Sequence, residues 1–134
     1  MQLSFFGATQ TVTGSRYLLA CDRGRLLIDC GLFQGYKHLR LKNWAPLPFD
    51  PATLDAVLLT HAHLDHSGYL PVLVKQGFKG PIYATRATIE LCRILLPDSG
   101  HLQEEQAGVC KSTSLLEAFP GIAALHGAGR PGSP

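Results

Sequence analysis

The chain has 134 residues, of which 46% are hydrophobic and 16% charged, so its length and composition are those of one ordinary globular domain. A formal net charge of +2 is too small to indicate a nucleic-acid partner by itself, because proteins that bind through charge carry a clustered basic face. The longest apolar stretches fall well short of the ~18 residues that a membrane span needs, so we expect no membrane association.

Four cysteines stand at positions 21, 30, 92 and 110, and no two of them have the C-x-x-C spacing of a redox or zinc motif. The sequence shows no secretory signal ahead of them. We therefore expect reduced, mostly buried thiols in a cytoplasmic protein.

The first third of the chain reads as strands joined by turns. Apolar runs predict strands over residues 2–6, 16–21 and 25–30, and Asp22-Arg23-Gly24 predicts a hairpin between the last two. Residues 31–54 contain Gly31, Gly35 and three prolines, which predict an irregular segment.

The middle of the chain predicts strands that alternate with helices. A buried strand over 55–59 is followed by a helix over about 67–76, with Pro71 in its first turn. A short strand over 81–85 leads to a second helix, capped by Thr85 and ended by Pro97. This order predicts an α/β protein with helices covering a sheet, and residues 107–134 read as a poorly ordered tail.

The stretch THAHLDHSG, residues 60–68, places three histidines and an aspartate within six positions directly after a predicted buried strand. Alternate side chains share a face on an extended chain, so His61 and His63 can converge on one ion. A turn into the next helix points Asp65 and His66 toward a second ion. Imidazole and carboxylate are typical zinc ligands, and loops beyond the carboxyl ends of strands are where α/β folds build sites. The stretch therefore predicts a metal site.

H-x-H-x-D-H after a strand resembles the metallo-β-lactamase fold, a superfamily of mostly dizinc hydrolases that includes lactamases, thioesterases and nucleases. The flanking sequence resembles its β-CASP branch of RNA- and DNA-processing nucleases. The similar stretches are residues 6–15 (FGATQTVTGS), 27–35 (LIDCGLFQG), 81–85 (PIYAT) and 98–105 (DSGHLQEE). The resemblance implies a partial metallo-β-lactamase αββα sandwich in residues 1–106, with a mixed sheet and covering helices.

The resemblance also implies roles for individual residues. His61 and His63 would hold a first Zn²⁺, and Asp65 and His66 a second, with Asp65 also orienting or deprotonating the attacking water. Asp29 would fix a ligand imidazole by hydrogen bonding, and its alternative is a carboxylate that only shapes a turn.

Three small residues and three further histidines carry weaker signals. Gly7, Gly14 and Ser15 either shape a loop near the metals or form a plain tight turn. His38 and His126 read as ordinary surface or half-buried histidines, and His101 matches no ligand position of the family.

A complete family member carries more metal ligands than this sequence shows, together with an inserted β-CASP domain. Residues 122–130 can be encoded by DNA whose reading one base later gives L-P-L-Y-T-E-Q-D, a string that resembles family members. We therefore expect a frameshift near residues 107–110, after which residues 107–134 form a non-family tail.

The resemblance implies an RNA partner, with DNA as the alternative and a homodimer left open. We expect a zinc-dependent RNA phosphodiester hydrolase whose ions are under-coordinated. The alternatives are a catalytically inactive fragment and another hydrolase of the same fold, such as a thioesterase. Because the sheet would be incomplete, exposed apolar faces and an unpaired edge are also expected.

Overall fold

The structure is a computed structural model, and it describes residues 1–106. Five strands form one mixed sheet in the order β1-β2-β3-β4-β5. The strands are β1 (Gln2–Phe5), β2 (Tyr17–Cys21), β3 (Gly24–Ile28), β4 (Ala56–Leu58) and β5 (Ile82–Tyr83). The helical elements are α1 (Lys37–Arg40), η1 (Leu41–Trp44), η2 (Pro51–Thr53), α2 (Leu64–Ser67), α3 (Leu70–Lys75) and α4 (Arg86–Gln106).

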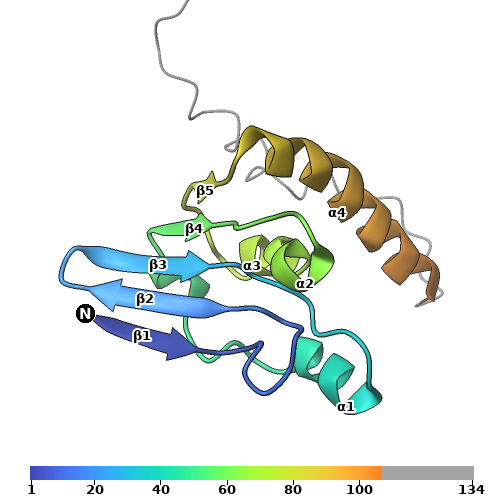
Figure 1. The fold of residues 1–134 in the computed structure, drawn as a ribbon, viewed down its shortest axis with the longest axis horizontal. Helices are drawn as coiled ribbons and strands as arrows, with labels where there is room; N and C mark the ends of the chain where they lie inside the picture. Colours follow the sequence, from blue (N-terminus) through green and yellow to red (C-terminus); the bar gives the residue numbers. More distant parts are fainter. Residues whose placement is uncertain (107–134) are drawn as a thin grey trace, which may run out of the picture.

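The sheet changes direction in its middle. β1, β2 and β3 are antiparallel neighbours, whereas β3, β4 and β5 are parallel. Parallel strands need crossovers, and α2 with α3 makes the one between β4 and β5. The predicted α/β class with a mixed sheet and covering helices is confirmed (Figure 1).

The strand register explains where the core lies. Leu18 pairs with Leu27, Leu27 with Val57, and Val57 with Ile82, so the four side chains form one row across β2 to β5. All four are at most 4% exposed. They pack with α3 and α4, whose buried residues in the same core are Leu70, Leu73, Cys92 and Leu96. Residues at alternate positions point to the opposite face.

That opposite face is apolar and open to solvent in the described residues. Phe5, Leu58 and Tyr83 are 59%, 40% and 47% exposed, and their strands carry them on the same row. The expectation of exposed apolar faces is therefore confirmed. β1 and β5 are the two edges of the sheet.

Two predicted helices have different bounds in the structure. The single helix expected over 67–76 is wrong: α2 begins at Leu64, and α3 begins after Tyr69 with Pro71 in its first turn. A proline cannot continue a helix without losing a backbone hydrogen bond and clashing with the preceding turn, so the chain starts a new helix there. Pro97 does not end α4, which continues to Gln106. The residues that anchor this helix in the core, Cys92 and Leu96, lie before the proline.

The segment 31–54, predicted to be irregular, contains three short helical turns. Each has only three or four residues, too few for a periodic pattern to predict. Side chains hold two of them. Asn43 accepts from the backbone N–H of Phe33 and donates to its carbonyl, both at 2.8 Å, and Asp50 caps η2 by accepting from Ala52 N–H at 3.0 Å.

Candidate metal centre

The histidine loop leaves the carboxyl end of β4 and turns into α2. His63 is the N-cap of α2, so His61 lies before the helix and His66 within it. The structure brings their rings together: ring centroids are 4.8 Å apart for His61 and His63, and 4.0 Å apart for His61 and His66. Three imidazoles from one short stretch therefore share one small region at the end of the parallel strands.

Asp65 lies beside the last of these rings. Its Oδ2 is 3.5 Å from Nε2 of His66, and the two side chains are 24% and 23% exposed. Solvent and small ions can reach both. The predicted pairs are His61 with His63 and Asp65 with His66, but the shortest ring distance, 4.0 Å, joins His61 to His66 across those pairs.

Asp29 is a buried carboxylate that contacts this cluster through Thr60 and His66. It is 2% exposed and its backbone has φ of +59°, the left-handed region that costs most non-glycine residues free energy. Its carboxylate accepts from the backbone N–H and the hydroxyl of Thr60, each at 2.8 Å, and lies 2.8 Å from Nδ1 of His66. A proton on Nδ1 that is donated to Asp29 leaves the Nε2 lone pair for a metal ion.

α2 is only four residues long, and such a helix is not stable by itself. Its carbonyls are held by backbone N–H groups from elsewhere in the chain. The Leu64 carbonyl accepts from Leu32 at 2.9 Å, that of Asp65 from Ser15 at 2.9 Å, and that of His66 from Cys30 at 2.8 Å. These bonds fix the positions from which the Asp65 and His66 side chains extend.

The close approach of these segments requires glycine. A Cβ on Gly31 would lie 1.6 Å from the Asp65 carbonyl oxygen, a distance at which the backbones could not remain in place. A Cβ on Gly7 would lie 1.7 Å from the Gly14 carbonyl oxygen. The loop 7–14 is therefore a tight turn, and Ser15 directly after it bonds to the helix that carries Asp65.

Two residues near the cluster were not predicted as site residues. The Thr60 hydroxyl donates to Asp29 and lies 2.9 Å from Nδ1 of His61, so it joins the carboxylate to a second imidazole. The Ser67 hydroxyl donates to the carbonyls of Ala62 and His63, at 2.9 and 3.1 Å. The sequence feature that could have predicted both residues is a hydroxyl side chain directly next to a histidine of the cluster.

Arg16 is a buried cation next to Gly31, the glycine that contacts α2. Arg16 is 3% exposed, donates through Nε and Nη2 to the Gly31 carbonyl at 3.2 and 2.9 Å, and lies 4.0 Å from the Tyr69 ring centroid. Burial lowers the pKa of Arg16, and burial raises the pKa of its neighbour Cys30 to about 12. A buried guanidinium and a protonated thiol thus lie behind the glycine that α2 contacts.

The donor types in the cluster suit zinc, but their number around one point is small. Within residues 1–106, no three His, Cys, Asp or Glu side chains are placed to hold one metal ion together. A catalytic zinc normally has three protein ligands and a water. The donors are therefore of types that a metal ion uses, but the described residues bring fewer of them around one point than a catalytic zinc requires.

Of the other histidines, the structure describes His38 and His101. His38 is on α1, where its ring stacks on Tyr36 with centroids 5.8 Å apart. His101 is on α4. His126 and the predicted tail at 107–134 lie outside the described residues.

Two further predictions concern the whole chain. Cys21, Cys30 and Cys92 are free thiols, as expected for three of the four cysteines. None of the helices in the described part of the chain combines the length and apolar character needed to cross a membrane.

Residues 11–102 match the family model described as the metallo-beta-lactamase superfamily. The chain is 52% identical over 105 residues to "Ribonuclease TTHA0252" of Thermus thermophilus, covering 78% of this chain and 24% of that protein. It is 39% identical over 104 residues to "Transcription termination factor FttA" of Cenarchaeum symbiosum, covering 74% and 16%. The chain thus spans about a quarter or less of the length of these curated relatives.

Among solved structures, the chain is similar to the metallo-beta-lactamase GOB-18 from Elizabethkingia meningoseptica, with 26% identity and a TM-score of 0.47. The similarity covers 66% of this chain and 31% of that one.

Proposed function

The chain belongs to the metallo-β-lactamase superfamily, and on that premise we propose that it is part of a zinc-dependent hydrolase of the RNA-processing β-CASP type, which hydrolyses phosphodiester bonds of RNA. The observation that carries the proposal is the gathering of His61, His63 and His66 beside Asp65 at the carboxyl ends of parallel strands. The relatives named as a ribonuclease and a termination factor support RNA as the substrate class. Residues 1–106 would form the N-terminal part of the metallo-β-lactamase domain.

The proposed roles follow the two pairs of ligands predicted from the family resemblance. His61 and His63 would hold one zinc ion, and Asp65 and His66 the other. When bound, such ions supply Lewis-acid activation of water and stabilise charge on the attacking and leaving oxygens. Asp65 would in addition orient the attacking water or accept its proton, and Asp29 would hold the orientation of the His66 ring through its 2.8 Å contact.

Zinc dependence of RNA cleavage tests this function. The whole chain would be incubated with zinc and a labelled RNA, with EDTA in a parallel reaction and a thioester as an alternative substrate. We expect RNA cleavage that EDTA abolishes and that His63→Ala reduces, while Arg23→Ala, in the exposed turn between β2 and β3, leaves it unchanged. Thioester hydrolysis without RNA cleavage would contradict the proposal.

One observation favours a second candidate. Because three ligands for one ion are not gathered in the described residues, the chain could bind zinc weakly and lack hydrolase activity. Zinc binding that depends on His63, without hydrolysis of either substrate, would support this non-catalytic candidate. The cytoplasmic location and the homodimer stay predictions.

A further inference from the structure

Residues 36–44 (YKHLRLKNW), which we call the basic aromatic segment, expose two large rings. Tyr36 is 77% exposed and Trp44 is 86% exposed. The segment comprises Tyr36 followed by α1 and η1. Rings of this size usually supply much of a core when they are buried, so their exposure on a defined turn indicates a contact surface.

The same segment concentrates positive charge. Lys37, Arg40 and Lys42 lie within six residues, and no aspartate or glutamate occurs between residues 31 and 49. Those three charges exceed the net charge of +2 of the whole chain. In the part of the chain that the structure describes, none of the three pairs with a carboxylate; Lys42 instead lies 5.4 Å from the Phe33 ring centroid.

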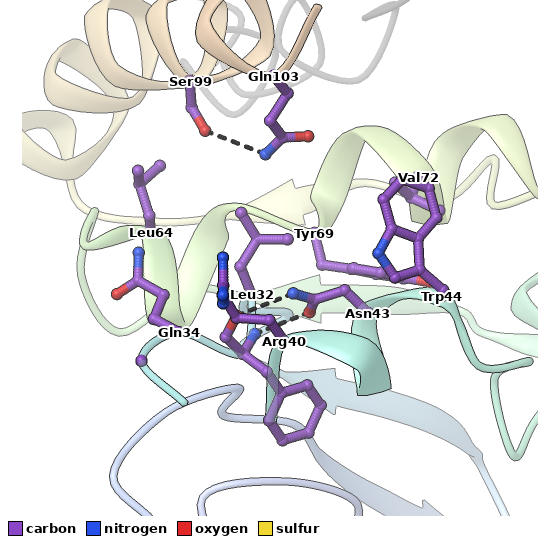
Figure 2. Close-up of a pocket in the computed structure, with 12 residues that line it drawn as sticks. Leu32, Gln34, Arg40, Asn43, Trp44, Leu64, Tyr69, Val72, Ser99 and Gln103 are labelled. Carbon is purple, nitrogen blue, oxygen red and sulfur yellow. Dashed lines mark hydrogen bonds between the residues drawn. The ribbon is translucent and has the colours of Figure 1, made fainter. Parts of the chain in front are cut away.

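A cavity of about 570 Å³ opens beside the segment. Arg40, Asn43 and Trp44 line it on one side, and Ser99 and Gln103 of α4 line it on the other (Figure 2). Its volume is in the range of about 300–1,000 Å³ that small-ligand sites occupy. The lining of the cavity combines apolar side chains with amide and hydroxyl groups, a combination that suits a nucleobase.

The cavity borders the histidine cluster along the chain. Leu64 lines it and stands between His63 and Asp65. Leu32 also lines it, and the Leu32 N–H donates to the Leu64 carbonyl at 2.9 Å. A single-stranded nucleic acid held in the cavity would therefore continue past α2.

We propose that the basic aromatic segment and this cavity bind single-stranded RNA. Trp44 offers a face on which a base stacks, and Lys37, Arg40 and Lys42 contact the phosphates on either side. Aromatic faces interleaved with cations are how proteins bind single strands without sequence preference, because every base has a stacking face and every nucleotide a phosphate. A single strand carries a phosphate at every nucleotide and a base between successive phosphates, so three cations beside an exposed ring favour RNA over a protein partner.

This inference rests on the proposed function for its choice of RNA, but it is measured without metal or cleavage. Trp44 is the only tryptophan of the chain, so its fluorescence reports directly on the proposed stacking. The whole chain would be titrated in EDTA with an unstructured single-stranded RNA. We expect saturable quenching of Trp44, and at least fivefold weaker binding of a fluorescein-labelled RNA by Trp44→Ala, whereas Tyr83→Ala at the exposed sheet edge binds as the unchanged chain does.

A matched pair of charge variants tests the phosphate contacts. One variant replaces Lys37, Arg40 and Lys42 by glutamine, and the other replaces the exposed Arg23, Lys75 and Lys79, so both lose three charges. We expect the first to weaken RNA binding at least tenfold. It should also reduce the slope of log affinity against log salt by about 2, because each single-strand phosphate contact contributes about 0.7. The second variant should change both quantities much less.

Three outcomes would overturn the inference. Equal losses in the two triple variants would show that binding follows net charge alone. Saturation with RNA without quenching of Trp44 would exclude stacking there. Protection of Trp44 from acrylamide before RNA is added, in a chain that elutes as a dimer, would show that a second copy covers the segment. RNA binding as expected without zinc-dependent cleavage would instead contradict only the proposed function.

Discussion

The histidine cluster and the basic aromatic segment lie close together along the chain, but their side chains are held in opposite ways. In the cluster, the carboxylate of Asp29 is buried and makes three polar contacts of 2.8 Å, and α2 is fixed by three backbone hydrogen bonds. In the segment, Trp44 is 86% exposed. Fixed side chains suit the proposed metal ligands, because a metal ion needs a set geometry, whereas accessible rings and charges suit the proposed surface for single-stranded RNA.

The largest effect should come from breaking the hold on α2. Gly31→Ala forces a Cβ against the Asp65 carbonyl, so we expect a loss of about 3 kcal/mol or more in the free energy of unfolding, or failure to fold. Gly35→Ala is the matched control. It has a positive φ of +92°, but a Cβ added there would meet no atom within 4 Å, so the change should cost about 1 kcal/mol. Urea unfolding followed by circular dichroism measures both. An equal loss of unfolding free energy in both variants would show that α2 can move away from residue 31.

The next largest effect is expected on zinc affinity, when the carboxylate of Asp29 is removed. Asp29→Asn keeps the shape but places an amide where His66 donates, so we expect zinc affinity to fall about 10–100-fold. Competition with a coloured chelator measures the affinity. Asp55→Asn, which removes a carboxylate that accepts from Arg25 N–H at 2.7 Å, should leave zinc affinity unchanged. A similar loss in both variants would mean that Asp29 acts through stability alone.

A smaller effect is expected at the threonine that joins two histidine contacts. Thr60→Val removes the hydroxyl that bonds to Asp29 and faces His61, but keeps the backbone N–H. We expect a loss of about 1 kcal/mol in the free energy of unfolding, with a threefold or greater loss of zinc affinity. Thr53→Val, whose hydroxyl donates to the Asp50 carbonyl at 2.7 Å, should affect stability only. Unchanged zinc affinity in Thr60→Val would remove Thr60 from the cluster.

The smallest effect tests burial behind the cluster. Burial raises the pKa of Cys30 to about 12 and also raises the pKa of Cys92, whereas Cys21 is exposed. In a Cys110→Ser chain at about pH 8, one thiol should therefore react rapidly with Ellman's reagent. Between about pH 9 and pH 12 the unfolded chain releases the proton that folded Cys30 keeps, so the free energy of unfolding should fall as pH rises. Three fast thiols would contradict the packed core.

The strands could be predicted because each follows a local pattern. The apolar runs and the Asp22-Arg23-Gly24 turn define β2 and β3 within one or two residues. The start of α2 at Leu64 depends on hydrogen bonds with residues distant in sequence, which no local pattern contains.

The candidate site shows the same division. Its histidines and Asp65 are neighbours in sequence, and Asp29 was proposed from the family resemblance. Thr60 became a member only through its contact with Asp29, across 31 positions of the chain. The basic aromatic segment was not predicted, because its residues form a surface only once α1 and η1 are in place.

The most direct test of the central claim is X-ray absorption at the zinc edge of the zinc-loaded chain. We expect nitrogen and oxygen ligands at about 2.0–2.1 Å with the multiple scattering of imidazole, which His61→Ala and His63→Ala together reduce. Sulfur ligands at about 2.3 Å, or an imidazole signal that the double variant leaves unchanged, would show that zinc binds elsewhere and would contradict the account.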